Sequence, residues 1–387
     1  MCFMSFEVSD RRRFVKGGIA LAGAASVLPL LNGCEKLRSH SGPTILSGRS
    51  ERSGNHFVGA YSLSGEPLFD LRIPDRAHGM AMNPVRPSEM IFFARRPGVH
   101  LHRLNIEDPL DVKTIDSEEG RHFYGHGCFS ADGSWLYNSE NDYENGRGLI
   151  TVRDAISLQV VEEYSSYGIG PHELRLMPDQ KTLVVANGGI LTHPSAPREP
   201  LNIETMQPSL VYIDLKSGRL LGNYQLPYSQ LGIRHIDVNA DGRVALATQI
   251  EADAQLPNGE QSMPLLATHH GEDQLQLFSV ESYSWNRLKD YCGSVAFAKG
   301  SDLKNIGAVT SPRAGRLAIF DFLNQNLVAD FAVPDVCGVC FSEKLGGFVA
   351  STGSGAIYLV EASAGKPNIE KLATQVGVYW DNHLLVV

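Results

Sequence analysis

The chain has 387 residues, of which 43% are hydrophobic and 20% charged, and its formal net charge is −9 at pH 7. A chain of this size and composition buries a full core, as one large domain or two ordinary ones, and is not intrinsically disordered. The acidic balance argues against nucleic acid as a partner, and six cysteines are too few for a disulfide scaffold.

The N-terminus has the pattern of an export signal. The charged segment Asp10–Lys16 precedes the weakly apolar segment Gly17–Leu31, which is too short and too rich in glycine and alanine to span a membrane. Its adjacent arginines resemble a twin-arginine signal, with a Sec-type signal or a basic amphipathic N-terminus as the alternative. We expect a signal peptide at residues 1–34, a linker at 35–42, and a location in the periplasm or another extracytoplasmic part of the envelope.

The end of this segment, Leu31-Asn32-Gly33-Cys34, resembles a lipobox, in which the cysteine becomes the lipidated first residue of the mature protein. An ordinary cleavage site that precedes a cysteine by chance is the alternative. A lipid on Cys34 would tether the mature protein to a membrane surface. No other stretch reaches ~18 consecutive apolar residues, so we expect no transmembrane span in the mature protein.

From residue 43 onward the sequence repeats one supersecondary unit. Each copy has an alternating strand, a turn that often contains Asp-Gly, a second strand, an apolar third strand and a short outer strand. Four short antiparallel strands in a unit of ~45 residues are typical of a propeller blade. Four copies begin at His78, His126, His172 and His235, and two others at Cys292 and Cys337. The two longest intervals between the first residues of successive copies predict inserted loops at residues 191–207 and 252–271.

The last copy begins at His383 and ends after a single strand, because the chain ends there. The three missing strands are found at the start of the repeat region, at Thr44–Leu46, His56–Tyr61 and Leu68–Arg72. The sequence therefore predicts an all-β, seven-bladed β-propeller over residues 43–387. Its ring is closed by three N-terminal strands plus one C-terminal strand, which leaves no unpaired edge.

The residue that starts each copy can ligate a metal ion in all seven blades. The first strand of a blade lines the central channel, so we predict a ring of imidazoles and thiolates at the hub. Such donors suit copper or iron, with zinc as a third candidate, and disfavour magnesium and calcium. One ion cannot take seven ligands, so three or four bind one ion or the ring holds a cluster. The predicted ligands are His78, His126, His172, His235, His383, Cys292 and Cys337.

Two alternatives remain open at this stage. The histidines could bond to one another and to channel water, and so hold the blades in register without a metal. The two cysteines lie on neighbouring blades and could form a disulfide after export.

The loops between second and third strands open on the same face as these residues and carry most of the nearby arginines. Guanidinium groups there would bind an anion or an anionic substrate. The alternative is that each arginine pairs with a neighbouring acid, namely Glu51, Glu140, Asp142 or Glu173. The predicted rim consists of Arg49, Arg95, Arg96, Arg147 and Arg313.

The hub resembles the seven-bladed propeller of nitrous oxide reductase, in which hub histidines surround a copper–sulfur cluster. Two cysteines replace histidines here and no cupredoxin domain follows. The resemblance therefore implies a hub metal but not reductase activity.

The motifs Arg-Ala-His78-Gly, Tyr-Gly-His126-Gly-Cys-Phe-Ser, Gly-Pro-His172-Glu-Leu and Ile-Arg-His235-Ile-Asp carry a wider resemblance. The whole mature chain is similar to an uncharacterised family of twin-arginine-exported bacterial propellers, a domain of unknown function. Genes of this family commonly lie beside imelysin-type proteins and a dihaem-peroxidase-like oxidoreductase, in iron-responsive clusters. The repeat also resembles exported YVTN-type propellers, with His where those place Pro-x-Gly. The resemblance implies metal handling in the cell envelope and no established activity.

The leading hypothesis is an envelope propeller that binds a transition metal for acquisition, delivery or redox chemistry, with an envelope metal-handling or redox protein as a partner. The first alternative is a protein-interaction propeller with structural histidines. The second is a hydrolase or lyase that acts on an anionic substrate at the arginines. The sequence contains no nucleophile elbow, phosphate-binding glycine loop or His-Glu-x-x-His motif, so no catalytic residue is assigned.

Overall fold

The computed structural model describes most of the chain after the predicted linker, namely residues 42–196, 199–251, 263–280, 283–300 and 302–387. Contacts divide the chain into two units, Met1–Cys34 and Glu35–Val387. The first unit lies wholly outside the described residues, so the signal peptide and the lipidation of Cys34 stay predictions. No helix in the described part of the chain is long and apolar enough to cross a bilayer.

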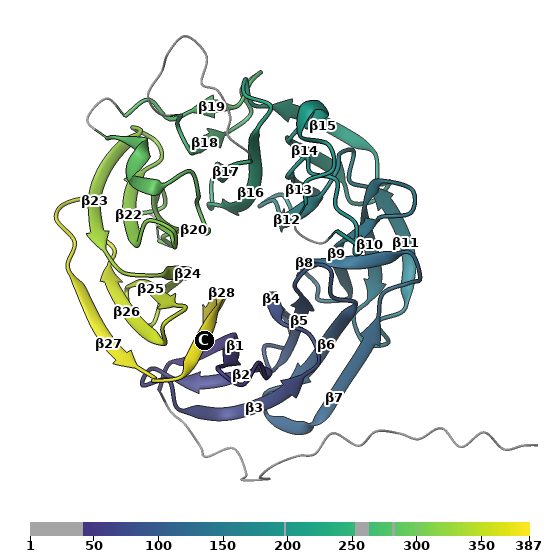
Figure 1. Ribbon diagram of the computed structural model, residues 1–387, viewed down its shortest axis with the longest axis horizontal. Helices are drawn as coiled ribbons and strands as arrows, with labels where there is room; N and C mark the ends of the chain where they lie inside the picture. Colours follow the sequence, from purple (N-terminus) through teal and green to yellow (C-terminus); the bar gives the residue numbers. More distant parts are fainter. Residues whose placement is uncertain (1–41, 197–198, 252–262, 281–282, 301) are drawn as a thin grey trace, which may run out of the picture. The chain divides into compact units, whose positions relative to one another are not determined.

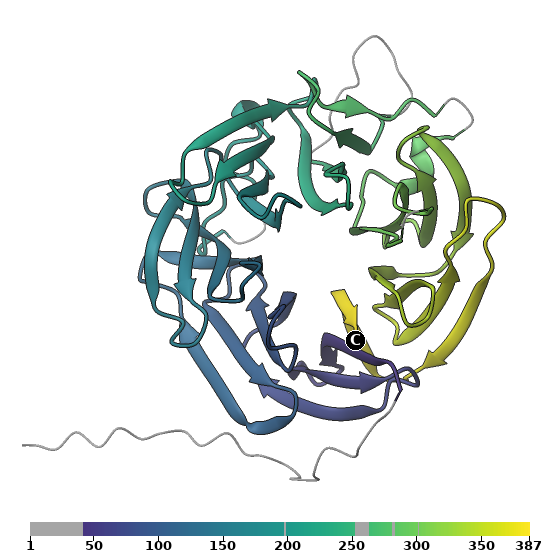
Figure 2. The same cartoon turned by 180° about the vertical axis from the view of Figure 1, so that it is seen from behind.

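The described strands form seven antiparallel sheets of four strands each, arranged as blades around a central axis (Figures 1 and 2). Blade 1 consists of β28 (Val378–Val386), β1 (Thr44–Glu51), β2 (His56–Ser62) and β3 (Pro67–Ile73). Blade 2 consists of β4 (Ala77–Met82), β5 (Glu89–Ala94), β6 (His100–Asn105) and β7 (Asp108–Asp116). Blade 3 consists of β8 (Arg121–Phe129), β9 (Trp135–Asp142), β10 (Arg147–Asp154) and β11 (Val160–Ser165).

The remaining blades follow in chain order. Blade 4 consists of β12 (Pro171–Leu176), β13 (Thr182–Asn187), β14 (Ser209–Asp214) and β15 (Leu220–Gln225). Blade 5 consists of β16 (Leu231–Val238), β17 (Val244–Ile250), β18 (Leu266–His269) and β19 (Gln276–Leu277). Blade 6 consists of β20 (Ser294–Phe297), β21 (Ile306–Ser311), β22 (Arg316–Asp321) and β23 (Asn326–Ala332). Blade 7 consists of β24 (Val336–Ser342), β25 (Gly347–Thr352), β26 (Ala356–Glu361) and β27 (Ile369–Thr374).

The ring closes in blade 1, where the two ends of the repeat region share one sheet. Strand β28 pairs with β1 along its length, from Ile45 opposite Val386 to Glu51 opposite Val378. Thr44 and Val387 also exchange two backbone hydrogen bonds, each of 2.9 Å. The predicted seven-bladed propeller, closed by three N-terminal strands and one C-terminal strand, is confirmed. Pairing both ends in one sheet removes the free edge that an open array would expose.

The core lies between the blades, because each sheet is apolar on both faces and packs against its two neighbours. Phe93 of blade 2 and Phe123 of blade 3 share such a cluster and are fully buried. The predicted Asp-Gly turns are present. Gly133 has φ +67°, and a Cβ there would lie 2.4 Å from the Asn83 side chain of blade 2, so the turn needs glycine for conformation and for space.

The predicted C-terminal boundary of the loop at residues 252–271 is wrong, because the strand β18 (Leu266–His269) lies within this range. This strand has four residues, all buried, and pairs with β17. A strand buried on both faces shows no alternation, so its pattern is invisible at this length. The other insertion, 191–207, contains a single turn of 3-10 helix, η1 (Ile203–Thr205), and a second 3-10 turn, η3 (Trp285–Leu288), lies between blades 5 and 6.

We expect Trp380→Ala to destabilise the ring strongly. Trp380 on β28 is 2% exposed and stacks edge-on against Tyr61 of β2 at 4.8 Å, so it helps to fasten the C-terminal strand to blade 1. Removing a buried tryptophan side chain costs about 3–5 kcal/mol of unfolding free energy. Urea denaturation measures this loss, and Trp135→Ala is the control because Trp135 is 38% exposed. Equal effects of the two substitutions would contradict this role of Trp380.

Candidate metal centre

Five imidazoles from five consecutive blades meet in the channel. The innermost strands β28, β4, β8, β12 and β16 each supply one of them, and nine of the ring pairs have centroids 4.7–6.1 Å apart. We call these residues the hub cluster; they are His383, His78, His126, His172 and His235. The structure thus brings together all five histidines that the repeat alignment selected, although they are scattered over three hundred positions of sequence.

The innermost strands pair irregularly where they carry these histidines. In each of the five strands the pairing register shifts at or beside the histidine, as between Ala77 and Met80 in β4 and between Pro171 and Leu174 in β12. Such a bulge places extra residues opposite the partner strand and redirects their side chains. Strand β24, the innermost of blade 7, has the same kind of shift around Cys337, between Val336 and Val339, whereas the described part of β20 in blade 6 pairs without one. The shift alone therefore does not bring a side chain into the cluster.

The nitrogen atoms of the cluster lie at spacings suited to a shared ligand. Nε2 of His78 and Nε2 of His172 are 3.2 Å apart. One ligand atom each from His78, His126 and His172 lie within 4.8 Å of one another, and the same holds for His78, His235 and His383. A third such group consists of His126, Glu173 and His235, so His78, His126 and His235 each belong to two of the three groups.

Several of these nitrogens are buried without a hydrogen-bond partner among the described residues. They are His78 Nδ1, His126 Nε2, His172 Nδ1 and His383 Nε2. A buried polar atom without a partner costs about 1–3 kcal/mol. Four such atoms in one cluster indicate that the folded protein satisfies them with something other than its own described side chains.

Burial keeps the imidazoles neutral. Desolvation, followed by the charges of neighbouring histidines, lowers the pKa values of His78, His126 and His172 well below 6.5. Desolvation and the neighbouring His235 lower the pKa of His383 to about 3. A neutral imidazole is the form that ligates metal ions, so the cluster needs no deprotonation at neutral pH.

Two carboxylates orient the rings from outside the cluster. Glu173 accepts a hydrogen bond from Nδ1 of His235 at 3.1 Å and lies 3.7 Å from Nδ1 of His126. Asp381 lies 3.7 Å from Nδ1 of His78. Only the contact with His235 is a hydrogen bond, and it leaves Nε2 of that ring as the free donor, as around many metal-bound histidines.

Each carboxylate also holds an arginine. Arg175 contacts Glu173 at 2.6 Å and Arg76 contacts Asp381 at 2.6 Å. Burial raises the pKa of Glu173, but Arg175 and the hydrogen bond from His235 outweigh it and hold that pKa at about 2. Sequence reasoning gave Glu173 and Asp381 no role at the hub. Their adjacency to His172 and His383 in the chain was the available signal.

The two cysteines lie apart from the hub cluster. Sγ of Cys292 faces the Leu265 carbonyl oxygen at 3.9 Å, and Sγ of Cys337 faces the carbonyl oxygen of Asp381 at 3.4 Å. Both are free thiols, and burial raises the pKa of Cys337 to about 12. Neither belongs to a group of three potential ligands in the described chain. The structure therefore does not bring them to the imidazoles, because both sulfurs turn toward backbone carbonyls of the neighbouring blade.

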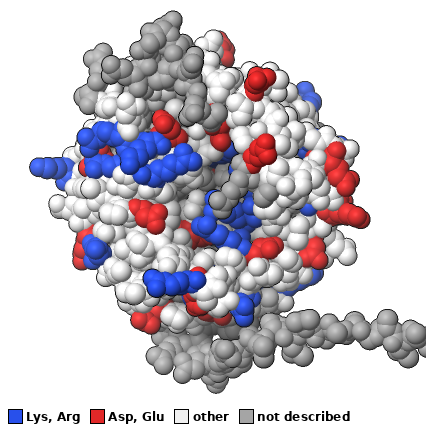
Figure 3. Space-filling model, in the orientation of Figure 1, with Lys and Arg blue, Asp and Glu red and all other residues white. Residues whose placement is uncertain are grey.

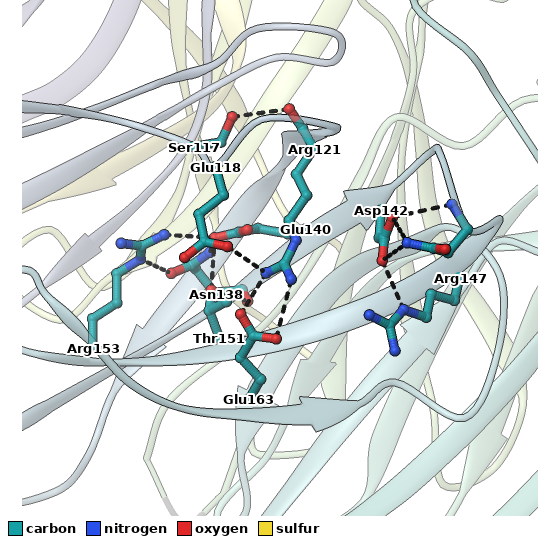
Figure 4. A network of polar contacts seen from close by, with 11 residues as sticks. Ser117, Glu118, Arg121, Asn138, Glu140, Asp142, Arg147, Thr151, Arg153 and Glu163 are labelled. Carbon is teal, nitrogen blue, oxygen red and sulfur yellow. Dashed lines mark hydrogen bonds and ion pairs between the residues drawn. The ribbon is translucent and has the colours of Figure 1, made fainter.

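Two arginines of the predicted rim are paired with acids. Arg49 contacts Asp70 on β3 and lies 4.1 Å over the Phe57 ring, so it points along blade 1. Arg147 contacts Asp142 at 2.7 Å (Figure 4). For these two residues the alternative of local ion pairing describes the structure.

The acid Glu140 is used inside blade 3, where it contacts Arg153 at 2.7 Å and accepts a hydrogen bond from Thr151 (Figure 4). Glu140 and Arg153 are 0% and 4% exposed, so this pair joins β9 and β10 away from solvent. Glu140 therefore does not neutralise the rim.

The other three rim arginines have no carboxylate ion pair among the described residues. Arg96 donates to the Tyr124 hydroxyl at 3.3 Å, and Arg313 lies 4.5 Å over the Tyr291 ring. Arg95 follows β5 and is exposed. Arg95 and Arg96 lie in the loop between β5 and β6, and Arg313 lies in the loop between β21 and β22.

Comparisons with known proteins supply a family. A family model described as "Protein of unknown function (DUF1513)" matches residues 71–387. No curated protein matches the chain. A chain of the solved structure titled "Crystal Structure of Mitotic Checkpoint Complex" is similar, at 12% identity and a TM-score of 0.49, over 76% of this chain and 78% of that one.

The stability of the metal-free protein should fall steeply as the pH drops below about 6.5. Unfolded histidine takes up a proton near pH 6.5, whereas the buried rings do not until far lower pH. As the pH falls from about 6.5 to the folded-state pKa of such a ring, the ring lowers the free energy of unfolding by up to ~1.4 kcal/mol per pH unit.

Urea midpoints of the metal-free protein between pH ~7.5 and ~5 measure this dependence. We expect the double variant His126→Ala, His172→Ala to have the shallower slope. An identical slope in the wild type and the variant would refute the burial of neutral imidazoles.

Proposed function

The chain belongs to the family described as "Protein of unknown function (DUF1513)", and because that description names no activity, we propose its function from the hub. We propose that this propeller binds a transition-metal ion through the hub cluster, for metal acquisition, delivery or redox chemistry in the cell envelope. His78, His126 and His172 form the principal ligand set, and His235 and His383 complete the lining.

The observation that carries this proposal is the 3.2 Å spacing of the Nε2 atoms of His78 and His172. Two nitrogens bound at ~2.0 Å to one tetrahedral ion lie about 3.3 Å apart. A hydrogen bond between the two rings would have a similar length. It would leave the buried nitrogens His126 Nε2 and His383 Nε2 without a partner, whereas an ion would engage nitrogens of this cluster together.

The donor set supports copper or iron, with zinc as the third candidate. Neutral imidazole suits these metals, whereas magnesium and calcium require oxygen ligands. The thiols of Cys292 and Cys337 face backbone carbonyls, so we leave them out of the proposed ligand set. Because Glu173 and Asp381 stand at Nδ1 of three rings, they would strengthen the donor nitrogens and fix the orientation of the rings.

The cellular setting of the proposal rests on the N-terminal sequence. An export signal at residues 1–34, with or without a lipid on Cys34, would place the propeller outside the cytoplasm. The metal would then be taken from, or passed to, another metal-handling or redox protein of the envelope. The deep position of the cluster favours storage, transfer or electron exchange of an ion that must be kept from bulk water.

Metal analysis of the protein expressed with its own leader tests the proposal. We expect the wild type to carry roughly one ion per chain and the double variant His126→Ala, His172→Ala to carry little. His102→Ala is the matched control, because His102 is a buried histidine of β6 outside the cluster and its Nε2 also lacks a partner.

The same proteins should then be stripped with a chelator and titrated with copper, iron and zinc salts. Wild type and His102→Ala should gain thermal stability with one of these metals, and the double variant should not. Negligible metal in the wild type, together with no stabilisation by any of the three ions, would reject the proposal. The histidines would then be structural, as in an interaction propeller.

A further inference from the structure

The channel mouth beside the hub cluster is lined by guanidinium groups from opposite sides of the ring. Figure 3 shows basic side chains gathered at the central hollow of this face, in a protein whose net charge is −9. Three of the arginines come from blade 2 and the segment before it, one from blade 5 and one from blade 6. We call them the mouth arginines; they are Arg76, Arg95, Arg96, Arg234 and Arg313.

Tyr291, which lies between blades 5 and 6, is the common neighbour of this group. Arg313 stacks 4.5 Å over its ring, and Tyr291 is also near enough to Arg76, Arg95 and Arg234 to influence their pKa values. Arg96 reaches the mouth from the other side and donates to Tyr124 at 3.3 Å. One small ligand could therefore contact several of these side chains at once.

The mouth is immediately adjacent to the hub cluster. The Tyr124 ring, which Arg96 contacts, lies 6.1 Å from the His172 ring. Arg76 and Arg95 interact electrostatically with His78, and Arg234 does so with His172. A ligand held at the mouth would thus lie beside two members of the principal ligand set.

The acids near the mouth do not neutralise it. Asp381 pairs with Arg76 at 2.6 Å, Glu251 pairs with Arg234 at 2.5 Å, and Asp335 interacts with Arg76 electrostatically. Of the five mouth arginines, Arg95, Arg96 and Arg313 have no carboxylate ion pair among the described residues, so their charges remain available to an anion.

One of the mouth arginines is also buried without full hydrogen bonding. Arg234 is 4% exposed, and its Nε has no partner in the described part of the chain. A buried guanidinium N–H is costly to leave unpaired, and oxyanions are its strongest partners. This is a second indication, independent of the unpaired charges, that the mouth accommodates an anion.

We propose that the channel mouth binds a small polyanion with two or more oxyanion groups, such as a tricarboxylate or a diphosphate. Arginines on opposite sides of the ring suit a ligand with separated anionic groups, because each guanidinium can bind one oxyanion in a bidentate manner. If the proposed metal is present, such an anion would cover it and could be its travelling chelator. That last role rests on the proposed function, whereas binding of the anion does not.

Calorimetric titration of the metal-free protein with citrate and with pyrophosphate tests the proposal. We expect saturable binding of at least one of them to the wild type, and at least 10-fold weaker binding to the double variant Arg95→Ala, Arg313→Ala. Tighter citrate binding would identify carboxylate chemistry, and tighter pyrophosphate binding would identify phosphate chemistry. Arg147→Ala is the matched control with unchanged affinity, because Arg147 is a predicted rim arginine already paired with Asp142.

The metal-ligand variant His126→Ala, His172→Ala should keep its affinity for the anion, which separates this proposal from that of the hub metal. Absence of binding of both anions to the wild type at millimolar concentration would overturn the proposal. So would equal affinities of the wild type and the Arg95→Ala, Arg313→Ala variant.

Discussion

Burying five imidazoles on one axis is the constraint on which the hub depends. Each ring has two polar nitrogens, and a channel packed with histidine cannot satisfy them all from the rings alone. Carboxylates provide part of the missing interactions. Glu173 accepts a hydrogen bond from His235 and lies near Nδ1 of His126, and Asp381 lies near Nδ1 of His78. Four ring nitrogens of the cluster keep no hydrogen-bond partner among the described residues, namely His78 Nδ1, His126 Nε2, His172 Nδ1 and His383 Nε2. The unpartnered nitrogens thus lie in one cluster, where an electron-pair acceptor such as a metal ion would bind most favourably.

The strand that closes the ring also supplies part of the hub site. Strand β28 completes blade 1, and the same strand supplies His383 to the cluster and Asp381 to His78. Arg76, between blades 1 and 2, then binds Asp381 and links the closing strand to the next blade. An open ring would lose one imidazole and one orienting carboxylate together. Closure of the ring therefore assembles the site, and the hub contacts in turn help to hold the C-terminal strand in place.

The charge of the molecule is distributed in a way that its net value conceals. The chain carries nine more acids than bases, yet the mouth beside the cluster has more guanidinium groups than neighbouring carboxylates. Arginines that pair within a blade, such as Arg49 and Arg147, contribute little to the field at the mouth. Cationic groups beside neutral imidazoles also oppose protonation of those rings. The pKa of His78 is lowered most by burial, next by His383 and then by Arg95. The same residues thus favour anions and preserve the ligand form of histidine.

The repeat pattern alone determined the blade count, the closure and the convergence of five histidines. Strands of a propeller have fixed places around the axis, so an aligned position in sequence becomes a shared position in space. Tertiary structure decided what periodicity cannot encode. Local packing decided which side chains reach the axis: the histidines do, whereas Cys292 and Cys337 face carbonyl groups, although β24 has the same pairing shift around Cys337 as β4 has around His78. Contacts between blades decided which acids orient the rings and which arginines remain unpaired, because such partners are distant in sequence and their choice depends on packing.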